Sequence, residues 1–338
     1  MSTYSEGTDL TAIRAGALRR APCVVALGTF DGVHRGHVAI LNDATRQARA
    51  LGLESVALTF DRLPLELLCP HEAPLILTPP HERIRLLRRY VDRVVNIRFD
   101  WSLAKLSPSE FVEQVLVQGL GCRGIVVGFN YTFGRGGSGN VDTLRTLARP
   151  LQVRVTVVPA VVTALGQISS TRIRQSVTGG EMEPAADMLG RPFALVGRVG
   201  KGDARGRQLG FPTANIACHR RQILPSKGVY VSEVRRLNNG LEGTSLIGDA
   251  VTAVSQQPTF DGRHITIESH VLDFGGDLYG QHLEVRLYHR LRPPIRFASA
   301  QELQEQIGQD VTAAREFLRF LRLHGCQSMI DLSSGTLG

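Results

Sequence analysis

Apolar positions in the first half of the chain follow two alternating periods. Short unbroken apolar runs, typical of buried parallel strands, occupy residues 23–30, 55–60, 93–99, 124–134 and 153–161. Between them, apolar residues recur at helical spacing over 37–51, 79–91 and 107–120. Strands that alternate with helices predict an α/β fold with a doubly wound parallel sheet. Ligands of such sheets bind at the carboxyl ends of the strands, near the switch in strand order.

The pattern changes after Pro192. Residues 169–192 are predicted to form helical segments with a Gly-Gly break. Short, often alternating stretches then follow at 193–200, 227–237, 245–254, 264–274 and 282–291, which is typical of a small antiparallel β-barrel. A C-terminal helix opens with Ser299 and Glu302 in a capping-box pattern, and Ser107 or Ser109 is the cap candidate of the helix over 107–120. We therefore expect domains over 1–189 and 190–330 and a tail over 331–338.

Length and charge narrow the class of protein. A chain of 338 residues exceeds what one hydrophobic core usually organises, so two domains are expected. A formal net charge of +8 fits either solubility or an anionic partner. Because the basic residues are spread along the chain, phosphorylated small molecules are favoured over nucleic acid.

Cysteine usage and hydropathy indicate the compartment. The five cysteines are odd in number and not closely paired, which indicates neither a disulfide framework nor a zinc site. The first residues lack a secretory pattern, and no run approaches the roughly 18 apolar residues of a membrane helix. We expect a cytoplasmic protein with no membrane partner. The sequence does not settle the oligomeric state, for which a monomer or weak homo-oligomer is the expectation.

The stretch "GTFDGVHRGH" holds His34 and His37 between a predicted strand and a predicted helix. Gly28 and Gly32 allow the backbone to approach a ligand closely. The helix is expected to begin near Gly36, so His37 lies where unpaired N–H groups and the helix dipole favour phosphate. Imidazoles there can donate hydrogen bonds to phosphate oxygens as charge builds in a transition state. Taken alone, the pair fits packing or surface histidines better, and a zinc site lacks a third ligand nearby.

Two further motifs turn this stretch into a resemblance. "GTFDGVHRGH" resembles the nucleotidyltransferase signature of prokaryotic FAD synthetases, "ISSTRIR" (168–174) resembles the second signature of that superfamily, and "GFNYTFGRGGSGN" (128–140) resembles the family's third conserved loop. The resemblance implies transfer of AMP from ATP to FMN with release of pyrophosphate, a reaction that depends on positioning and charge stabilisation. It implies that His34 and His37 are catalytic, and that ATP is bound by Gly28, Phe30, Asp31, Gly32, Asn130, Ser169, Ser170, Thr171 and Arg174.

The glycine-rich run over 197–216 is a flexible hairpin loop on its glycine spacing alone. Its end, "GFPTAN", resembles the riboflavin kinase motif, the module that forms the second half of prokaryotic FAD synthetases. The resemblance implies that ATP and flavin are bound by Gly202, Gly206, Gly210, Phe211 and Pro212. It also implies that Thr213 and Asn215 hold Mg²⁺, for which hydroxyl and amide oxygens are suitable ligands.

Glu268 lies in the alternating stretch 264–274, where an exposed strand carboxylate is the ordinary interpretation. By resemblance to the kinase it is the base that faces the 5′-hydroxyl of riboflavin. The "DLYG" run (277–280) and the C-terminal helix also match. The whole chain thus resembles the prokaryotic bifunctional riboflavin kinase/FAD synthetase family. The fold this implies is a nucleotidyltransferase-like Rossmann domain followed by a β-barrel, converting riboflavin to FMN and FMN to FAD.

Two stretches depart from the family's pattern. "TFDRLP" has Arg62 and Leu63 where the family usually has Pro and His, and "VSQQPTF" has Ser255 and Gln256 where it usually has Gly and Thr. Serine is strained wherever glycine adopts a positive φ. A second interpretation is therefore a diverged paralogue that keeps one half-reaction or acts on a modified flavin or another alcohol. A third is a regulatory module that binds flavin or nucleotide without catalysis, against which the intact candidate catalytic residues weigh.

Overall fold

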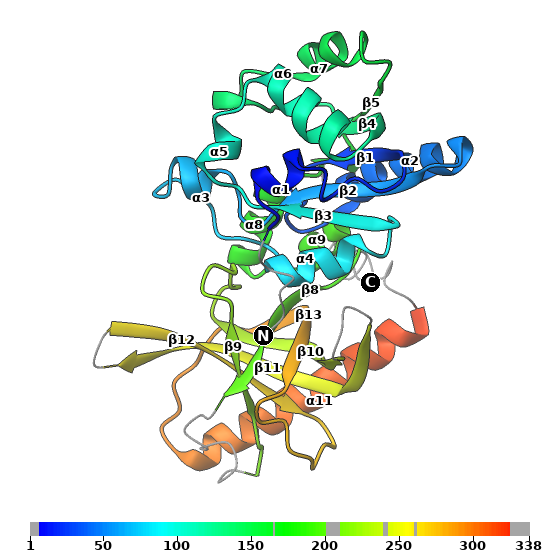
Figure 1. Ribbon diagram of the computed structural model, residues 1–338. Coiled ribbons are helices and arrows are strands. Elements are labelled where there is room, and N and C mark those ends of the chain that lie inside the picture. The colour runs from blue at the N-terminus through cyan, green and yellow to red at the C-terminus, as the bar shows by residue number, and fades with distance from the viewer. Residues whose placement is uncertain (1–6, 165, 201–209, 239–242, 260–261, 325–338) are drawn as a thin grey trace. The chain divides into compact units, whose positions relative to one another are not determined.

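The structure is a computed structural model that describes residues 7–164, 166–200, 210–238, 243–259 and 262–324, with the backbone alone at 257–259 and 262–264 (Figure 1). The chain forms two compact units, Met1–Ser170 and Thr171–Gly338. Helices α8 (Ser170–Gly179) and α9 (Met182–Leu189) flank the predicted Gly-Gly break. The domain boundary predicted between 189 and 190 lies at the end of α9 and stays a prediction.

Five parallel strands form the sheet of the first unit, in the order β3-β2-β1-β4-β5. Their bounds are β1 Cys23–Leu27, β2 Glu54–Phe60, β3 Arg93–Ile97, β4 Cys122–Gly128 and β5 Arg154–Val158. In β1, Val25 and Leu27 join one apolar cluster, whereas Val24 and Ala26 join another. Both faces of the sheet are therefore covered, which explains the unbroken apolar runs and confirms the doubly wound α/β prediction.

Helices supply the two clusters. Leu41 of α2 (Arg35–Leu51) and Leu87 of α4 (Pro80–Leu87) pack with Val24, whereas Ile13 of α1 (Leu10–Arg14) and Leu144 of α7 (Val141–Ala148) pack on the other face. The unit also contains α3 (Leu65–Leu68), α5 (Trp101–Ala104), the 3₁₀ turn η2 (Arg135–Gly137) and the hairpin of β6 (Val162–Thr163) and β7 (Gly166–Gln167). The sequence pattern predicted none of these short elements, nor α1.

The helix predicted over 107–120 is divided in two. A single turn, α6 (Pro108–Glu110), is followed by a π-helix, η1 (Phe111–Gly119). Ser107 is the N-cap: its hydroxyl accepts from the Glu110 N–H at 3.3 Å, and the Glu110 carboxylate accepts from the Ser107 N–H at 2.7 Å. The Ser107 candidate is confirmed and Ser109 is wrong as the cap.

Six antiparallel strands close into a barrel in the second unit, in the order β10-β11-β12-β9-β8-β13, with β13 paired to β10. Their bounds are β8 Phe193–Gly200, β9 Ala214–Cys218, β10 Gly228–Leu237, β11 Thr244–Thr259, β12 Gly262–Val271 and β13 His282–Arg292. The predicted barrel is confirmed. The sequence pattern missed β9, because this five-residue strand lies in the run expected to be a glycine-rich loop.

The C-terminal helix α11 (Ala300–His324) packs on the barrel. Its Ala314, Leu318 and Leu321 share an apolar cluster with Val231 and Val251. Ser299 accepts from the Glu302 N–H at 3.2 Å, but the Glu302 carboxylate accepts from the Ala298 N–H at 3.0 Å. The predicted capping box is therefore confirmed in its first half only.

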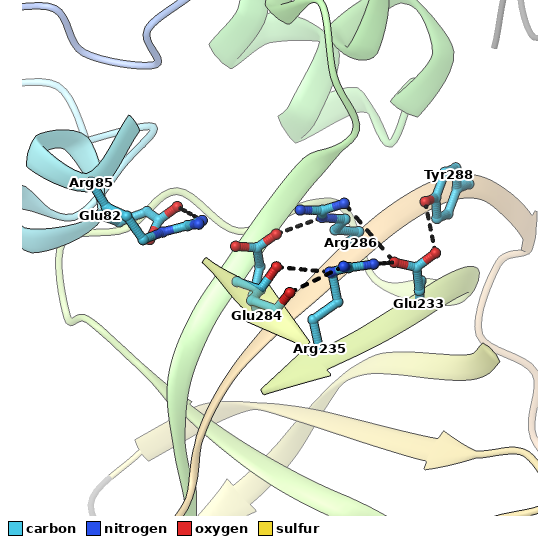
Figure 2. Close-up of polar contacts among 8 residues, drawn as sticks. Glu82, Arg85, Glu233, Arg235, Glu284, Arg286 and Tyr288 are labelled. Atoms are coloured by element: carbon cyan, nitrogen blue, oxygen red, sulfur yellow. Dashed lines mark hydrogen bonds and ion pairs between the residues drawn. The ribbon is translucent and has the colours of Figure 1, made fainter. Parts of the chain in front are cut away.

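Charged side chains face one another on the paired strands β10 and β13 (Figure 2). The register pairs Glu233 with Arg286 and Arg235 with Glu284. Arg235 donates to Glu233 at 2.6 Å, and the Tyr288 hydroxyl donates to Glu233 at 3.4 Å. Because each carboxylate has a guanidinium beside it, the buried Glu284 carries a compensated charge.

Three buried hydroxyls join β10, β11 and β12 from within the sheet. The oxygen of Thr252 lies 2.7 Å from that of Ser232 and 2.9 Å from that of Ser269, and Ser232 donates to the Ala250 carbonyl at 3.0 Å. A carbonyl only accepts and each hydroxyl has one proton, so Ser269 donates to Thr252 and Thr252 to Ser232. This series of hydrogen bonds gives partners to hydroxyls that are buried in the barrel wall.

Candidate functional site

The loop after β1 enters α2 through His34, which is the N-cap of that helix. Its Nδ1 accepts a hydrogen bond from the His37 N–H at 3.2 Å. An acceptor nitrogen carries no proton, so the cap places the proton of neutral His34 on Nε2. The helix starts at Arg35, one residue before the predicted start, and His37 lies in its first turn as expected.

The two histidine rings stack on each other. Their centroids are 3.6 Å apart at an interplanar angle of 15°, and Phe30 meets His37 edge-on at 5.3 Å. A Cβ on Gly36 would lie 3.1 Å from the His34 ring, so glycine lets that ring fold over the start of the helix. The cap and the stack therefore hold both rings at the N-terminus of α2, the end of a helix that favours phosphate.

The backbone of this loop is strained. Phe30 has φ +51°, Gly32 +89° and Val33 +41°, and both non-glycine side chains are fully buried. Left-handed backbone costs a non-glycine residue about 1–3 kcal/mol, and it persists only where packing fixes it. A Cβ on Gly28 would lie 3.1 Å from the Phe30 ring. The predicted glycines therefore serve turn geometry and close packing.

Asp31 uses its carboxylate to hold the loop. The side chain is buried and accepts from the Leu77 N–H at 3.0 Å and the Thr78 N–H at 3.1 Å. Its backbone carbonyl accepts from the Ser170 hydroxyl at 2.9 Å. Asp31 thus ties the β1 loop to the segment before α4 and to the first residue of α8. The predicted residues Asp31 and Ser170 are brought together.

A buried arginine that the sequence pattern did not predict lies near this loop. Arg83 of α4 is 1% exposed and donates to the carbonyl of Phe60 at the end of β2. Burial lowers the pKa of Arg83, and the charges of Asp31, Glu66 and Asp61 oppose that effect. Nothing in a helical apolar spacing shows that one of its arginines is buried.

The remaining candidates of the first half fall in two places. Asn130 is exposed just after β4, and its Oδ1 lies 3.6 Å from the position of a Cβ on Gly128. Since β1 and β4 are parallel neighbours at the switch in strand order, the loops after both strands lie at one edge of the sheet. Ser169 precedes α8, whereas Thr171 and Arg174 lie within α8 in the second unit.

The first departing stretch follows β2. Leu63 is buried and donates its N–H to Glu66 at 3.0 Å, whereas Arg62 is largely exposed and lies 3.4 Å from the Asp61 carboxylate. Asp61 also accepts from the Phe99 N–H at 2.8 Å. The cation of Arg62 therefore lies at the carboxyl edge of the sheet, in the stretch where the family usually has Pro and His.

Three candidates of the second half converge on the barrel. The Thr213 hydroxyl donates to the Glu268 carboxylate at 3.3 Å, and Asn215 of β9 is the direct partner of Glu268 in β12. Direct partners in an antiparallel pair point to the same face. The next residues along this row are Ala253 of β11 and Gly200 of β8, and a Cβ on Gly200 would meet open space. The row has two polar side chains at its centre and small residues at its ends.

A cavity of about 570 Å³ lies on the other face of the β9–β12 pair: its lining includes Ala214 and Ser269, whose side chains alternate with those of Asn215 and Glu268. Of the three candidates, Thr213 lines this cavity, whereas Asn215 and Glu268 do not. The cavity has the size of a small-molecule site. Pro212 and Thr213 line it together with apolar and glycine residues, and the matched "DLYG" run contributes to its wall. Its lining is Val199, Pro212, Thr213, Ala214, Ser269, Val271, Phe274, Gly275, Gly276, Asp277, Leu278 and Tyr279.

The glycine-rich run and the second departing stretch complete this site. Gly202 and Gly206 lie outside the described residues, whereas Gly210 has φ +85° and Phe211 meets His270 edge-on at 5.3 Å. The φ of Ser255 is not left-handed; its hydroxyl bonds to that of Thr266, its partner in β12, at 2.8 Å. The steric obstacle expected for serine there is absent.

Within the described ranges, no group of three or more His, Cys, Asp or Glu residues is placed to hold a metal ion. The hydroxyl of Thr213 and the amide of Asn215 are neutral oxygen donors of the kind that Mg²⁺ accepts alongside phosphates and water. Of the helices that the structure describes, none is both long and apolar enough to cross a membrane.

Comparisons with known proteins also divide the chain into two parts. A family model of FAD synthetase matches residues 18–172, and one of riboflavin kinase matches residues 189–318. The bifunctional riboflavin kinase/FMN adenylyltransferase of Escherichia coli is 39% identical over 304 residues, which cover 89% of this chain and 95% of the relative. The protein of the same name from Bacillus subtilis is 32% identical over 307 residues, covering 90% and 95%.

A solved structure from Streptococcus pneumoniae, named a macrolide-efflux protein, has a TM-score of 0.77 at 34% identity and covers 87% of this chain and 94% of that chain. The same two-part fold is therefore present in a solved relative. The chain belongs to the family of bifunctional riboflavin kinase/FMN adenylyltransferases, with an FAD synthetase part followed by a riboflavin kinase part.

Proposed function

We propose that the barrel phosphorylates riboflavin to FMN with ATP, and that the parallel-sheet domain transfers AMP from a second ATP to FMN, giving FAD and pyrophosphate. The observation that carries the kinase half is the contact of Thr213 with Glu268, whose direct strand partner is Asn215. Thr213 also lines the cavity of about 570 Å³. The observation that carries the adenylyl half is the stacked His34 and His37 at the start of α2.

Glu268 is the general base of the kinase step. Its carboxylate accepts the proton of the riboflavin 5′-hydroxyl as that oxygen forms a bond to the γ-phosphorus of ATP and the bond to the β-γ bridging oxygen breaks. The Thr213 hydroxyl, 3.3 Å away, orients the carboxylate. Mg²⁺, held by Thr213 and Asn215, would supply charge neutralisation for the phosphates. Phe211, Pro212, Gly210, Gly206 and Gly202 would cover the nucleotide and flavin.

In the adenylyl step the FMN phosphate attacks the α-phosphorus of ATP and pyrophosphate leaves. His34 and His37 donate hydrogen bonds to the phosphate oxygens whose charge grows in the transition state, and the first-turn N–H groups of α2 add to this. Gly28, Phe30, Asp31 and Gly32 shape the loop. Asn130, Ser169, Ser170, Thr171 and Arg174 contact the nucleotide. No covalent enzyme intermediate is needed, because positioning and charge stabilisation suffice.

The finer cellular description is part of the same proposal. We place the enzyme in the cytoplasm, where flavins and ATP are its partners, as a monomer or weak homo-oligomer. No described feature of the barrel or the sheet favours a diverged paralogue over the bifunctional enzyme. The backbone of Ser255 removes the steric reason for one.

The test is a reciprocal pair of variants in the full chain. Glu268→Gln should abolish FMN formation from riboflavin, ATP and Mg²⁺ while FAD formation from added FMN continues; His34→Asn should do the reverse. Products are separated by chromatography. A wild-type protein that forms neither product would overturn the proposal, and a Glu268→Gln variant with an unchanged FMN rate would remove Glu268 from the mechanism.

A further inference from the structure

A histidine on the same face of β12 as Glu268 makes a contact that the proposed chemistry does not use. His270 follows Glu268 by two residues, so both side chains point to one face of the strand. The Nδ1 of His270 lies 2.9 Å from the carbonyl oxygen of Pro212. A carbonyl can only accept, so Nδ1 carries the proton and donates it. The ring also meets Phe211 edge-on, with centroids 5.3 Å apart.

The contact lies where the ladder between β12 and β9 stops. The last paired residues are Ser269 and Ala214, so the next rung would involve His270 and Thr213. Pro212 has no N–H and cannot donate a hydrogen bond to a ladder. Its carbonyl is instead bonded by the imidazole. A side-chain bond thus takes over from the backbone pairing immediately before Thr213.

We propose that His270 is a positioning residue of the kinase site, which fixes the Phe211–Thr213 segment so that the Thr213 hydroxyl reaches Glu268. Thr213 is held from one side by β9, which begins at the next residue, and from the other by the bond from His270 to Pro212. Without that bond, the described contact of His270 with this segment is reduced to its edge contact with Phe211. The loss would fall on the 3.3 Å contact between Thr213 and Glu268.

Two variants separate the donor from the ring. His270→Phe keeps an aromatic ring against Phe211 but has no N–H. His270→Asn loses the ring but carries an amide N–H at the distance of Nδ1 from the backbone. We expect His270→Phe to lower the kcat/KM for riboflavin phosphorylation about 5- to 30-fold, the effect of one lost hydrogen bond that positions a reacting group. We expect His270→Asn to restore the rate to within about threefold of the wild type.

A double-mutant cycle tests whether His270 acts through Thr213. If it does, His270→Phe should cost less than about threefold in a Thr213→Val background, because the contact it protects is already gone. A structural role would instead multiply the two losses. Adenylyl transfer to added FMN, measured on the same samples, should stay unchanged in the single variants and reports that the chain is folded.

The inference rests on the proposed function, and the two fail differently. No FMN from the wild-type protein would refute the proposed kinase activity itself. If the wild type is active, any of three results would overturn the positioning role alone. The first is an unchanged rate in His270→Phe, and the second is an inactive His270→Asn beside an active His270→Phe. The third is a double-mutant cycle in which the two losses multiply fully.

Discussion

His34 caps α2 and is also proposed to donate a hydrogen bond to a phosphate oxygen. One pair of substitutions separates these two roles. Its Nδ1 accepts the His37 N–H at 3.2 Å and closes the first turn of α2. Asn is among the best N-caps and its side-chain oxygen can accept the same N–H, whereas Ala cannot. The free energy of unfolding of His34→Asn should therefore lie within about 0.5 kcal/mol of the wild type, and that of His34→Ala should be about 1 kcal/mol lower. Both variants lose the ring stacked on His37, so the difference between them reports the cap.

The rate should respond differently from the stability. If the imidazole donates to a phosphate oxygen in the transition state, both variants lose about 10²- to 10³-fold in FAD formation from FMN, as for one preorganised donor. Urea unfolding followed by fluorescence gives the stability, and pyrophosphate release from ATP and FMN gives the rate. A His34→Asn variant that adenylylates FMN within about threefold of the wild type would refute the donor role and leave His34 as a cap.

Three further changes probe contacts away from the reacting atoms. Asp31→Asn presents an amide N–H to the Leu77 N–H, so it should slow adenylyl transfer at least about 10-fold while riboflavin phosphorylation stays unchanged; equal rates would contradict the loop-holding role. Thr252→Val breaks the hydroxyl chain and should cost about 1–3 kcal/mol in urea unfolding, and an unshifted midpoint would count against that chain. Hydrogen bonds from Ser55 hold the pKa of Asp92 below its usual value, so this carboxylate stabilises the fold above about pH 4 and less as pH falls. Asp92→Ala should therefore be less stable than the wild type at pH 7, and the difference in the free energy of unfolding should narrow by pH 3. A difference that widened at low pH would contradict this.

Strand and helix periods predicted the architecture because burial imposes them. The strands ending at Leu27 and Gly128 are buried on both faces. In β10 residues 228–232 are all buried as well, because α11 packs against Val229 and Val231, and burial becomes uneven only in the second half of the strand. β9 was missed because it lies at the end of the glycine-rich run that was expected to be a loop. The π-helix η1 escaped because its buried residues, such as Phe111 and Val115, also suit an ordinary helix.

The candidate site was predictable where a motif carried it and not where geometry did. His34 and His37 were expected at a helix start, but histidine is not a favoured cap, so the stack and the cap were not foreseen. The left-handed backbone of Phe30 depends on surrounding packing, which no local pattern reports. The contact of Asp31 with ATP stays a prediction, and the bonds from its carboxylate to backbone N–H groups were not foreseen.

Because Asn215 is the direct strand partner of Glu268, the proposed kinase site depends on the register of β9 against β12. Side chains alternate between the inside and the outside of the barrel, so shifting β9 by one residue against β12 would send Asn215 to the opposite face. Inserting or deleting a single residue in β9 before Asn215 should therefore remove it from the site altogether, whereas a change of two residues keeps the face. The length of β9 can therefore change only in steps of two residues if Asn215 is to stay on the face of Glu268.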